Sequence, residues 1–169
     1  MSTRLTALVM FWLGAAVLFI AVVAPAAFAV LPSRTMAGLV IGRVLPVLFW
    51  SGATVGAVVL VMTSGWPRAA ALIMILACLG AQLGVAPAIR TTRAALGADL
   101  EALDPSDPRR VTFGRLHAIS VALLGVGMLA AASVALGGVL SHRTLQGLGA
   151  LGPVRRTTSA DTLHSSSTS

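Results

Sequence analysis

The sequence predicts an all-α fold, an integral membrane four-helix bundle, and three observations support this. Hydrophobic residues make up 57% of the 169 residues, and charged residues only 10%, whereas a soluble domain carries about 25% charged residues. Four apolar segments are long enough to cross a bilayer core about 30 Å thick, which needs about 20 helical residues. None of the four contains a charged residue, so lipid is the expected solvent for most of the chain.

Each segment is expected to be a helix, because a chain in hydrocarbon must satisfy its backbone polar groups within the segment. One four-span domain of residues 1–143 is predicted, and the Ser/Thr-rich residues 144–169 are predicted to form a disordered tail. The expected helices cover about residues 5–31, 44–63, 69–88 and 118–140.

The first segment has a rival interpretation as a secretory signal peptide. Arg4 would be its charged start, and Ala27-Phe28-Ala29 resembles an A-x-A cleavage site. Signal h-regions span about 7–15 residues, and this apolar run is longer. The length favours a retained helix.

The connections between the segments are unequal. Residues 64–68 are predicted to form a tight turn, with Trp66 at headgroup depth, and residues 32–43 a longer connection. Residues 89–117 form the largest loop, which holds four of the five acidic residues. Within it, Asp107 and Pro108 are a helix-start signal, so the fourth helix is expected to begin about two turns before its apolar part.

The net charge of +7 comes from twelve arginines, with no lysine. We find no basic stripe interleaved with aromatic residues, so nucleic acid is not an expected partner. The arginines instead flank membrane segments, where they contact anionic lipid headgroups of the bilayer. The composition is typical of a GC-rich bacterium and points to the bacterial inner membrane. The positive-inside rule favours both long loops in the cytoplasm and both termini outside.

Few side chains could carry chemistry. On a helix, Arg110, Phe113, His117, Ser120 and Leu124 share one face. His117 could be a haem or metal ligand or a proton-handling group; the alternative is a structural histidine bonded to a neighbouring helix. One histidine without a second ligand is weak evidence for haem, because metal sites need converging ligands.

Other candidates lie in the second and third segments. Gln82 would need a partner in lipid and is interpreted as an interhelical link. Gly52–Gly56 and Gly80–Gly84 have the GxxxG spacing and predict tight packing within the bundle. Cys78 is the only cysteine, so an intrachain disulfide is impossible.

Pro25, Phe28, several arginines and His117 project to the membrane face that carries the two long loops. A functional site is expected there, unless these arginines only anchor headgroups and pair with the acids of residues 99–107. The candidate functional face comprises Pro25, Phe28, Arg43, Gln82, Pro87, Arg90, Arg93, Phe113, Arg115, His117 and Ser120.

Three motifs carry a family resemblance: Val23–Phe28 with Ala37-Gly38 and Gly42, Gly84–Arg90, and Phe113–Ser120. In order and spacing, over about residues 8–140, they resemble the transmembrane protein 205-like family (domain of unknown function 4149). The resemblance implies a four-helix membrane bundle without an established activity; a eukaryotic member's association with platinum-drug resistance hints at metal or drug handling. The bundle also resembles small haem-dependent protoporphyrinogen oxidases and copper resistance protein D, but it lacks their additional membrane histidines and lysine.

Three functional hypotheses remain open. The first is a non-enzymatic membrane protein with a scaffold, accessory or small-solute role, favoured by the absence of charge in the spans and of catalytic motifs. The second is a haem-binding redox protein that uses His117. The third is a transporter of metal or small solute, which would need to be a homo-oligomer because four helices leave little room for a polar path.

Overall fold

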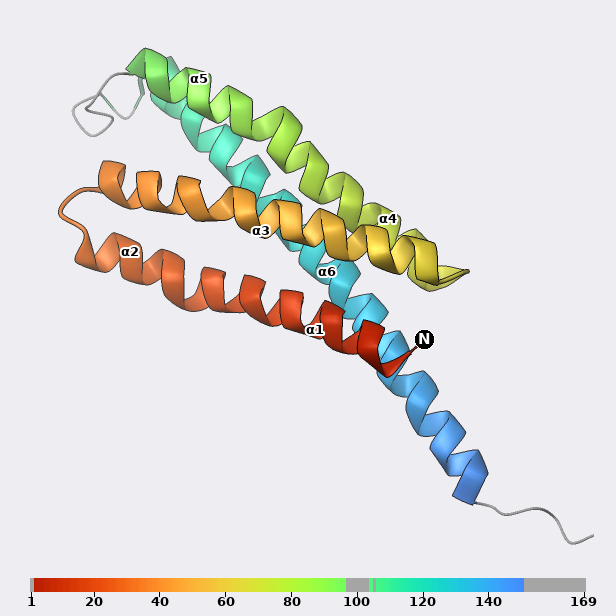
Figure 1. Cartoon of the computed structure of the whole chain (residues 1–169). Helices are drawn as coiled ribbons and strands as arrows, with labels where there is room; N and C mark the ends of the chain where they lie inside the picture. Colours follow the sequence, from red (N-terminus) through yellow and green to blue (C-terminus); the bar gives the residue numbers. More distant parts are fainter. Residues whose placement is uncertain (1, 97–103, 105, 151–169) are drawn as a thin grey trace, which may run out of the picture.

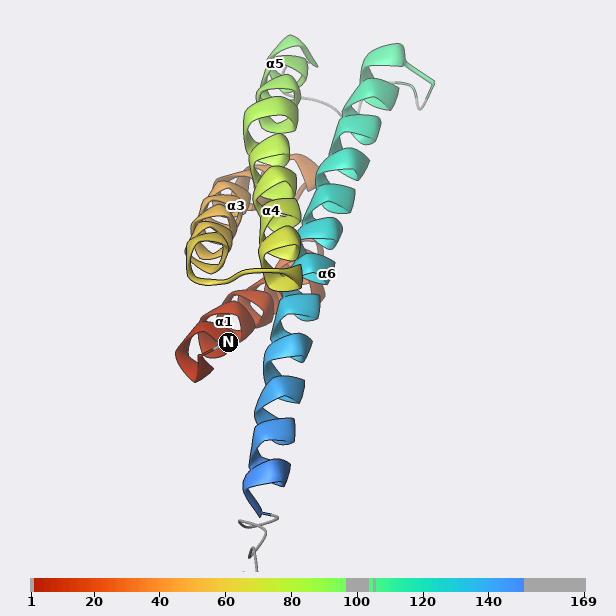
Figure 2. The ribbon, with the colours of Figure 1, turned by 90° about the vertical axis from the view of Figure 1, so that its right-hand side faces the viewer.

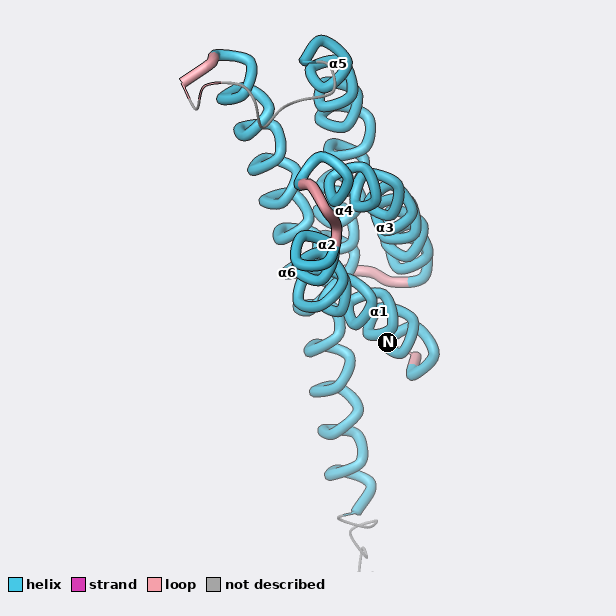
Figure 3. The backbone as a smooth tube through the Cα atoms, turned by 90° about the vertical axis from the view of Figure 1, so that its left-hand side faces the viewer, coloured by secondary structure: helices cyan, strands magenta, loops and turns pink. Residues whose placement is uncertain are grey.

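The computed structural model describes residues 2–96, 104 and 106–150. Within these ranges the chain forms helices and no strand (Figure 3), which confirms the predicted all-α class. Four helical stretches are long and apolar enough to cross a membrane, as predicted: Thr3–Val30, Arg34–Met62, Trp66–Ala95 and Pro108–Leu140.

Two of the four stretches are interrupted by a π-helical segment, written η. The first stretch comprises α1 (Thr3–Leu18), η1 (Phe19–Val23) and α2 (Ala24–Val30). The third comprises α4 (Trp66–Leu79), η2 (Gly80–Val85) and α5 (Ala86–Leu96). The second and fourth are single helices, α3 (Arg34–Met62) and α6 (Pro108–Ala150).

Each π-helical segment ends on the valine of the same sequence, Val-Ala-Pro-Ala, which contains Pro25 in α2 and Pro87 in α5. Proline has no backbone N–H to donate, and its ring displaces the carbonyl four residues earlier. A π turn relieves this conflict. Accordingly, the N–H of Ala24 bonds to Phe19 O, and that of Ala86 bonds to Ala81 O.

The helices begin earlier than the apolar segments do. Ser33 caps α3 by accepting a hydrogen bond of 3.2 Å from the Met36 N–H, so the predicted long connection at residues 32–43 is wrong. Only residues 31–33 join α2 to α3. A charged residue limits an apolar run but does not limit the helix. The sequence prediction placed the start of the helix where the apolar run begins.

At the other long loop, α6 begins at Pro108. Asp107 Oδ1 accepts a hydrogen bond of 2.8 Å from the Arg109 N–H, as a capping aspartate does. At its far end α6 continues through residues 144–150, which the sequence assigned to the tail. Residues 151–169 lie outside the described part of the chain.

The helices run back and forth between two ends of the bundle. The start of α1 lies at the end toward which α6 runs, and the connection between α2 and α3 lies at the opposite end, as do the end of α5 and the start of α6 (Figure 1). We call the latter the loop end. α6 is the longest helix and extends beyond the start of α1 (Figure 2).

Four helices meet closely at one level of the core. A Cβ atom added at Gly52 of α3 would stand 2.6 Å from Trp12 Cζ2 of α1 and 2.9 Å from Cys78 Sγ of α4. One added at Gly127 of α6 would lie 3.8 Å from the Trp12 ring and 3.7 Å from the same sulfur. The buried indole N–H of Trp12 donates a 3.1 Å hydrogen bond to Leu48 O. We call this group the four-helix junction.

Only one of the two GxxxG motifs packs as predicted. In α3, Gly56 continues the contact begun by Gly52, since a Cβ there would lie 2.8 Å from Ile75 Cγ1 of α4. In η2, a Cβ at Gly80 or Gly84 would have no neighbour within 4 Å among the described atoms. The packing prediction is therefore wrong for the second motif.

The outer surface of the bundle suits lipid. Large apolar side chains such as Phe11, Val61 and Leu129 are more than two-thirds exposed. In water such a surface would associate, whereas in a bilayer it is the surface that the solvent requires.

We expect Gly52→Ala to destabilise the protein, because the added methyl group would push the rigid Trp12 ring away from α3. Overpacking of this kind costs about 1–3 kcal/mol. The measurement is thermal unfolding in detergent, followed by circular dichroism. Gly14→Ala is the matched control, because a Cβ at Gly14 meets nothing within 4 Å; equal unfolding temperatures for the two variants would contradict the close packing.

Candidate functional site

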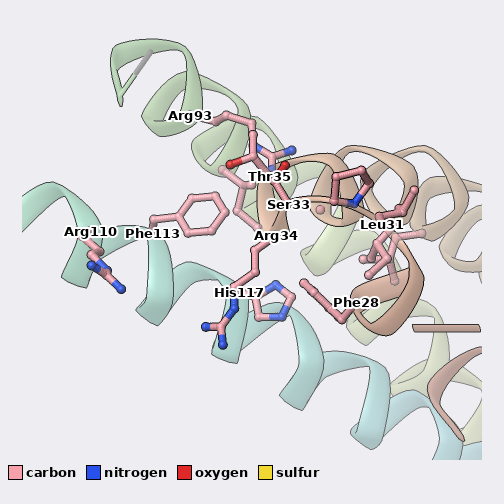
Figure 4. A pocket seen from close by; sticks show the side chains of 15 residues that line it. Phe28, Leu31, Ser33, Arg34, Thr35, Arg93, Arg110, Phe113 and His117 are labelled. Atoms are coloured by element: carbon pink, nitrogen blue, oxygen red, sulfur yellow. The ribbon is translucent and has the colours of Figure 1, made fainter. Parts of the chain in front are cut away.

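A cavity of about 610 Å³ lies at the loop end, between α2, α3, α5 and α6 (Figure 4). Its walls combine aliphatic and aromatic side chains with three arginines and a histidine. We call it the loop cavity, and it is lined by Phe28, Leu31, Pro32, Ser33, Arg34, Thr35, Gly38, Ile41, Gly42, Leu45, Ile89, Arg93, Arg110, Phe113 and His117.

A second cavity of about 380 Å³ adjoins the first. The two share Gly42, Leu45, Ile89 and Arg93 as lining residues. We call it the glutamine cavity, and it is lined by Leu39, Gly42, Arg43, Leu45, Pro46, Phe49, Gln82, Ala86, Ile89, Arg90, Arg93, Ala94 and Ser120.

The cavities exist because the helices separate toward the loop end. Among the described residues, no Cα atom of α2 lies within 8 Å of one in α6, and none of α3 lies within 8 Å of one in α5. Both helix pairs belong to stretches that pack together nearer the middle, where α1 contacts α6 and α3 contacts α4. At the loop end the space between the helices stays open and is lined by side chains, whereas nearer the middle core side chains fill it.

Arg93 occupies the boundary between the two cavities. Its Cζ atom lies 5.6 Å from the centroid of the Phe113 ring of α6, which is cation–π distance. Its Nη2 atom would stand only 2.5 Å from a Cβ atom at Gly38 of α3. The guanidinium of α5 therefore reaches both neighbouring helices, and the missing side chain at Gly38 makes room for it.

The two carboxylates that the structure describes before α6 are already engaged. Asp107 forms an ion pair of 3.1 Å with Arg109, and hydrogen bonds from Arg109 hold the pKa of Asp107 below its usual value. Hydrogen bonds from Ser106 likewise lower the pKa of Asp104. Arg109 is not one of the arginines of the candidate face, so the predicted pairing of those arginines with the acids of residues 99–107 is not seen among the described residues; residues 99 and 101 lie outside the described part.

Three of the cavity arginines have no carboxylate partner within the described residues: no Asp or Glu oxygen lies within 4 Å of Arg43, Arg90 or Arg93. All three line cavities whose remaining walls are largely apolar. Arg43 and Arg90 are exposed and Arg93 is half-buried, so Arg93 is the charge of the three that is screened least and attracts anions most strongly.

His117 is exposed and lines the loop cavity. In Figure 4 its ring lies near Phe28, and the Arg34 side chain reaches from the start of α3 toward it. Among the described residues, no three His, Cys, Asp or Glu side chains gather closely enough to hold a metal ion.

The helix face predicted around His117 lines the two cavities and continues into the core. Arg110, Phe113 and His117 line the loop cavity, while Ser120 is buried and lines the glutamine cavity. Leu124, the next residue on that face, is buried in the core.

Eight of the eleven candidate residues line the cavities: Phe28, Arg43, Gln82, Arg90, Arg93, Phe113, His117 and Ser120. The other three, Pro25, Pro87 and Arg115, line neither cavity. The candidate face did not include Arg34 and Gly38, which line the loop cavity and lie in α3. Ser33 was the signal that could have found them, since a serine before an uninterrupted helical stretch is a typical N-cap.

A family model described as domain of unknown function (DUF4149) matches residues 7–97, more than half of the chain. The chain belongs to the DUF4149 family. No curated protein and no solved structure matches it. In this DUF4149 protein the match covers α1 to α5, including the motifs Val23–Phe28 and Gly84–Arg90. The third motif, Phe113–Ser120, lies beyond it.

Proposed function

We propose that this protein binds small acidic amphiphiles, molecules with one acidic group and an apolar body, in its two adjoining cavities. The observation that carries the proposal is the convergence of five arginines from three helices on two largely apolar cavities: Arg34, Arg43, Arg90, Arg93 and Arg110. Of the scaffold and small-solute roles that the sequence leaves open, the cavities favour the second.

The arginines select for acids. A guanidinium binds a carboxylate or phosphate through two parallel hydrogen bonds. Arg43, Arg90 and Arg93 have no carboxylate from the described chain to bind, so an acidic ligand would satisfy charges that otherwise line a cavity in a membrane protein. Arg93, which lines both cavities, is the residue best placed to hold the acid.

The remaining walls select for an apolar body. Phe28, Leu31 and Phe113 line the loop cavity, and Phe49 lines the glutamine cavity. Both volumes, about 610 and 380 Å³, fall in the range of small-molecule sites. A ligand that is both acidic and apolar would reach them from the surrounding bilayer.

The membrane in which this binding takes place, and the orientation of the chain in it, are also part of the proposal. We infer a multi-pass protein of the bacterial inner membrane, with the loop end in the cytoplasm and the termini outside, because more arginines flank the loop end. Anionic headgroups and a second copy of the chain are further proposed partners. We also propose that, within the DUF4149 family, the chain is of the transmembrane protein 205-like type.

We expect Arg93→Gln to weaken the binding of tetradecanoate about tenfold or more, the loss typical of one charge-assisted hydrogen bond. The measurement is equilibrium binding to the full chain in nanodiscs of zwitterionic lipid. Arg115→Gln removes the same charge from an exposed position that lines neither cavity, and it should bind normally. Equal losses in both variants would reduce the effect to net charge and contradict the proposal.

A second pair of variants keeps every charge. Gly38→Ala should displace the Arg93 guanidinium and weaken tetradecanoate binding. Gly42→Ala should have a smaller effect, because a Cβ at Gly42 meets nothing within 4 Å although the residue lines both cavities. The same nanodisc assay compares them, and a reversed order would argue against Arg93 as the anchor.

Haem is a second candidate, because His117 lines the same cavity as Arg34 and Arg110; the arginines could bind propionates while the imidazole binds iron. We expect no His117-dependent Soret band when haem is supplied to the purified protein. Absorption spectra of the wild type and His117→Ala decide the point. A band that appears in the wild type and is lost in the variant would make this a haem protein.

A further inference from the structure

The loop cavity lies between two helical hairpins. α2 contacts α3 and α5 contacts α6, so each hairpin is held together. Between the hairpins, among the described residues, no Cα atom of α2 lies within 8 Å of one in α5 or α6, and none of α3 lies within 8 Å of one in α5. Residues of all four helices line the cavity, so a ligand there would contact both hairpins.

Each hairpin extends an arginine toward the other. Arg93 of α5 reaches α3, because its Nη2 atom would stand 2.5 Å from a Cβ atom at Gly38. Arg34, the first residue of α3, extends in the opposite direction toward His117 of α6 (Figure 4). Arg110 of α6 lines the same cavity. Three arginines from three helices therefore line one space between the hairpins.

Acidic side chains do not offset these charges within the cavity. None of its described lining residues is Asp or Glu. Hydrogen bonds from Ser106, and then the charge of Arg110, lower the pKa of Asp104, but Asp104 is exposed and lines neither cavity. Arg93 and Arg110 are half-buried, so water screens their charges less than those of exposed arginines.

The glutamine cavity has fewer charges of this kind. Of its three arginines only Arg93 is half-buried, while Arg43 and Arg90 are exposed. The Oε1 atom of Gln82 is buried and has no hydrogen-bond partner in the described chain. It therefore neither accepts an interhelical bond, as the sequence interpretation expected, nor is open to a ligand. The loop cavity is the stronger anion site of the two.

The number of arginines distinguishes between acids. A carboxylate has one negative charge and two oxygens, which a single guanidinium can bind through two parallel hydrogen bonds. A phosphate monoester carries about 1.5 to 2 negative charges at pH 7 and has three terminal oxygens, so it can bind two guanidinium groups at once. A phosphodiester has one charge and two terminal oxygens, and in this respect it resembles the carboxylate.

We propose that the loop cavity selects lipid phosphate monoesters, with the phosphate between the two hairpins and the apolar chain against Phe28 and Leu31. This rests on the proposed function and names its substrate class. Arg93 binds two of the terminal oxygens. Arg110, together with Arg34 from the other hairpin, stabilises the second negative charge.

The test compares tetradecyl phosphate with methyl tetradecyl phosphate, a diester in which one oxygen is methylated and one charge is lost. Binding is measured on the full chain in zwitterionic nanodiscs at pH 8, where the monoester is doubly charged because its second pKa is about 6. Empty nanodiscs measure partition into the bilayer, which is subtracted. We expect the wild type to bind the monoester about tenfold more tightly, the difference made by one charge-assisted hydrogen bond.

Variants of the arginines test their roles. Arg110→Gln should lose most of this preference and still bind the diester, because Arg93 remains. Arg34→Gln should act in the same direction from the other hairpin. Arg115 lines neither cavity, so Arg115→Gln is the control and should keep the preference of the wild type. A preference that survives unchanged in both Arg34→Gln and Arg110→Gln would overturn the assignment.

The outcomes separate this inference from the proposed function. If the wild type binds the diester and tetradecanoate as tightly as the monoester, selection for a second charge is overturned and acid binding stands. If none of the three ligands binds, the proposed function fails as well. The wild-type comparison decides both points even if a variant does not fold.

A last arm distinguishes a lipid headgroup from free phosphate. Inorganic phosphate has the charge and the oxygens of the headgroup without an apolar chain. It should displace tetradecyl phosphate only at concentrations about a hundredfold higher or more, because it buries no apolar surface. Displacement at equal concentration would identify a soluble phosphate as the ligand and overturn the apolar body of the proposed function.

Discussion

The contact of Trp12 with the bare backbone at Gly52 is the constraint on which the bundle depends. Because Gly52 has no side chain, the indole ring lies against α3, where its N–H reaches Leu48 O at 3.1 Å. Cys78 and Gly127 bring α4 and α6 to the same level. Lipid tails provide no hydrophobic force to press helices together, so close backbone approach and buried hydrogen bonds must hold them.

The position of this junction determines where the bundle can open. The helices meet closely there, and toward the loop end α2 separates from α6 and α3 from α5. The two Val-Ala-Pro-Ala sequences occur on the loop-end side of the junction, each after a π turn. The π turns and the cavities therefore lie on the same side of the junction. A packed core and a charged cavity can coexist in so short a chain because they lie at different depths.

The sequence predicted the fold class well because hydrocarbon imposes one simple requirement, a long uncharged helix. It predicted helix ends poorly, because Arg34–Arg43 carry charge and are nevertheless helical. The face from Arg110 to Ser120 followed from helical spacing alone. Helical spacing could not predict that Gly52 packs against other helices while Gly80 does not. The GxxxG spacing shows that a close approach is possible, but it does not show which helix approaches. The role of Gly38 could not be predicted either, because it depends on the direction of the Arg93 side chain, which comes from another helix.

The helices pack closely at the four-helix junction, and we propose that the cavity at the loop end holds a ligand. The most direct measurement is the rate at which a water-soluble maleimide labels Thr35→Cys, a position that lines the loop cavity, with and without tetradecanoate. Cys78 is 1% exposed and should not react, and Ser64→Cys at the opposite end serves as the reference. We expect the ligand to slow labelling at position 35 several-fold and to leave labelling at position 64 unchanged. Equal labelling of position 35 with and without the ligand would contradict the proposal.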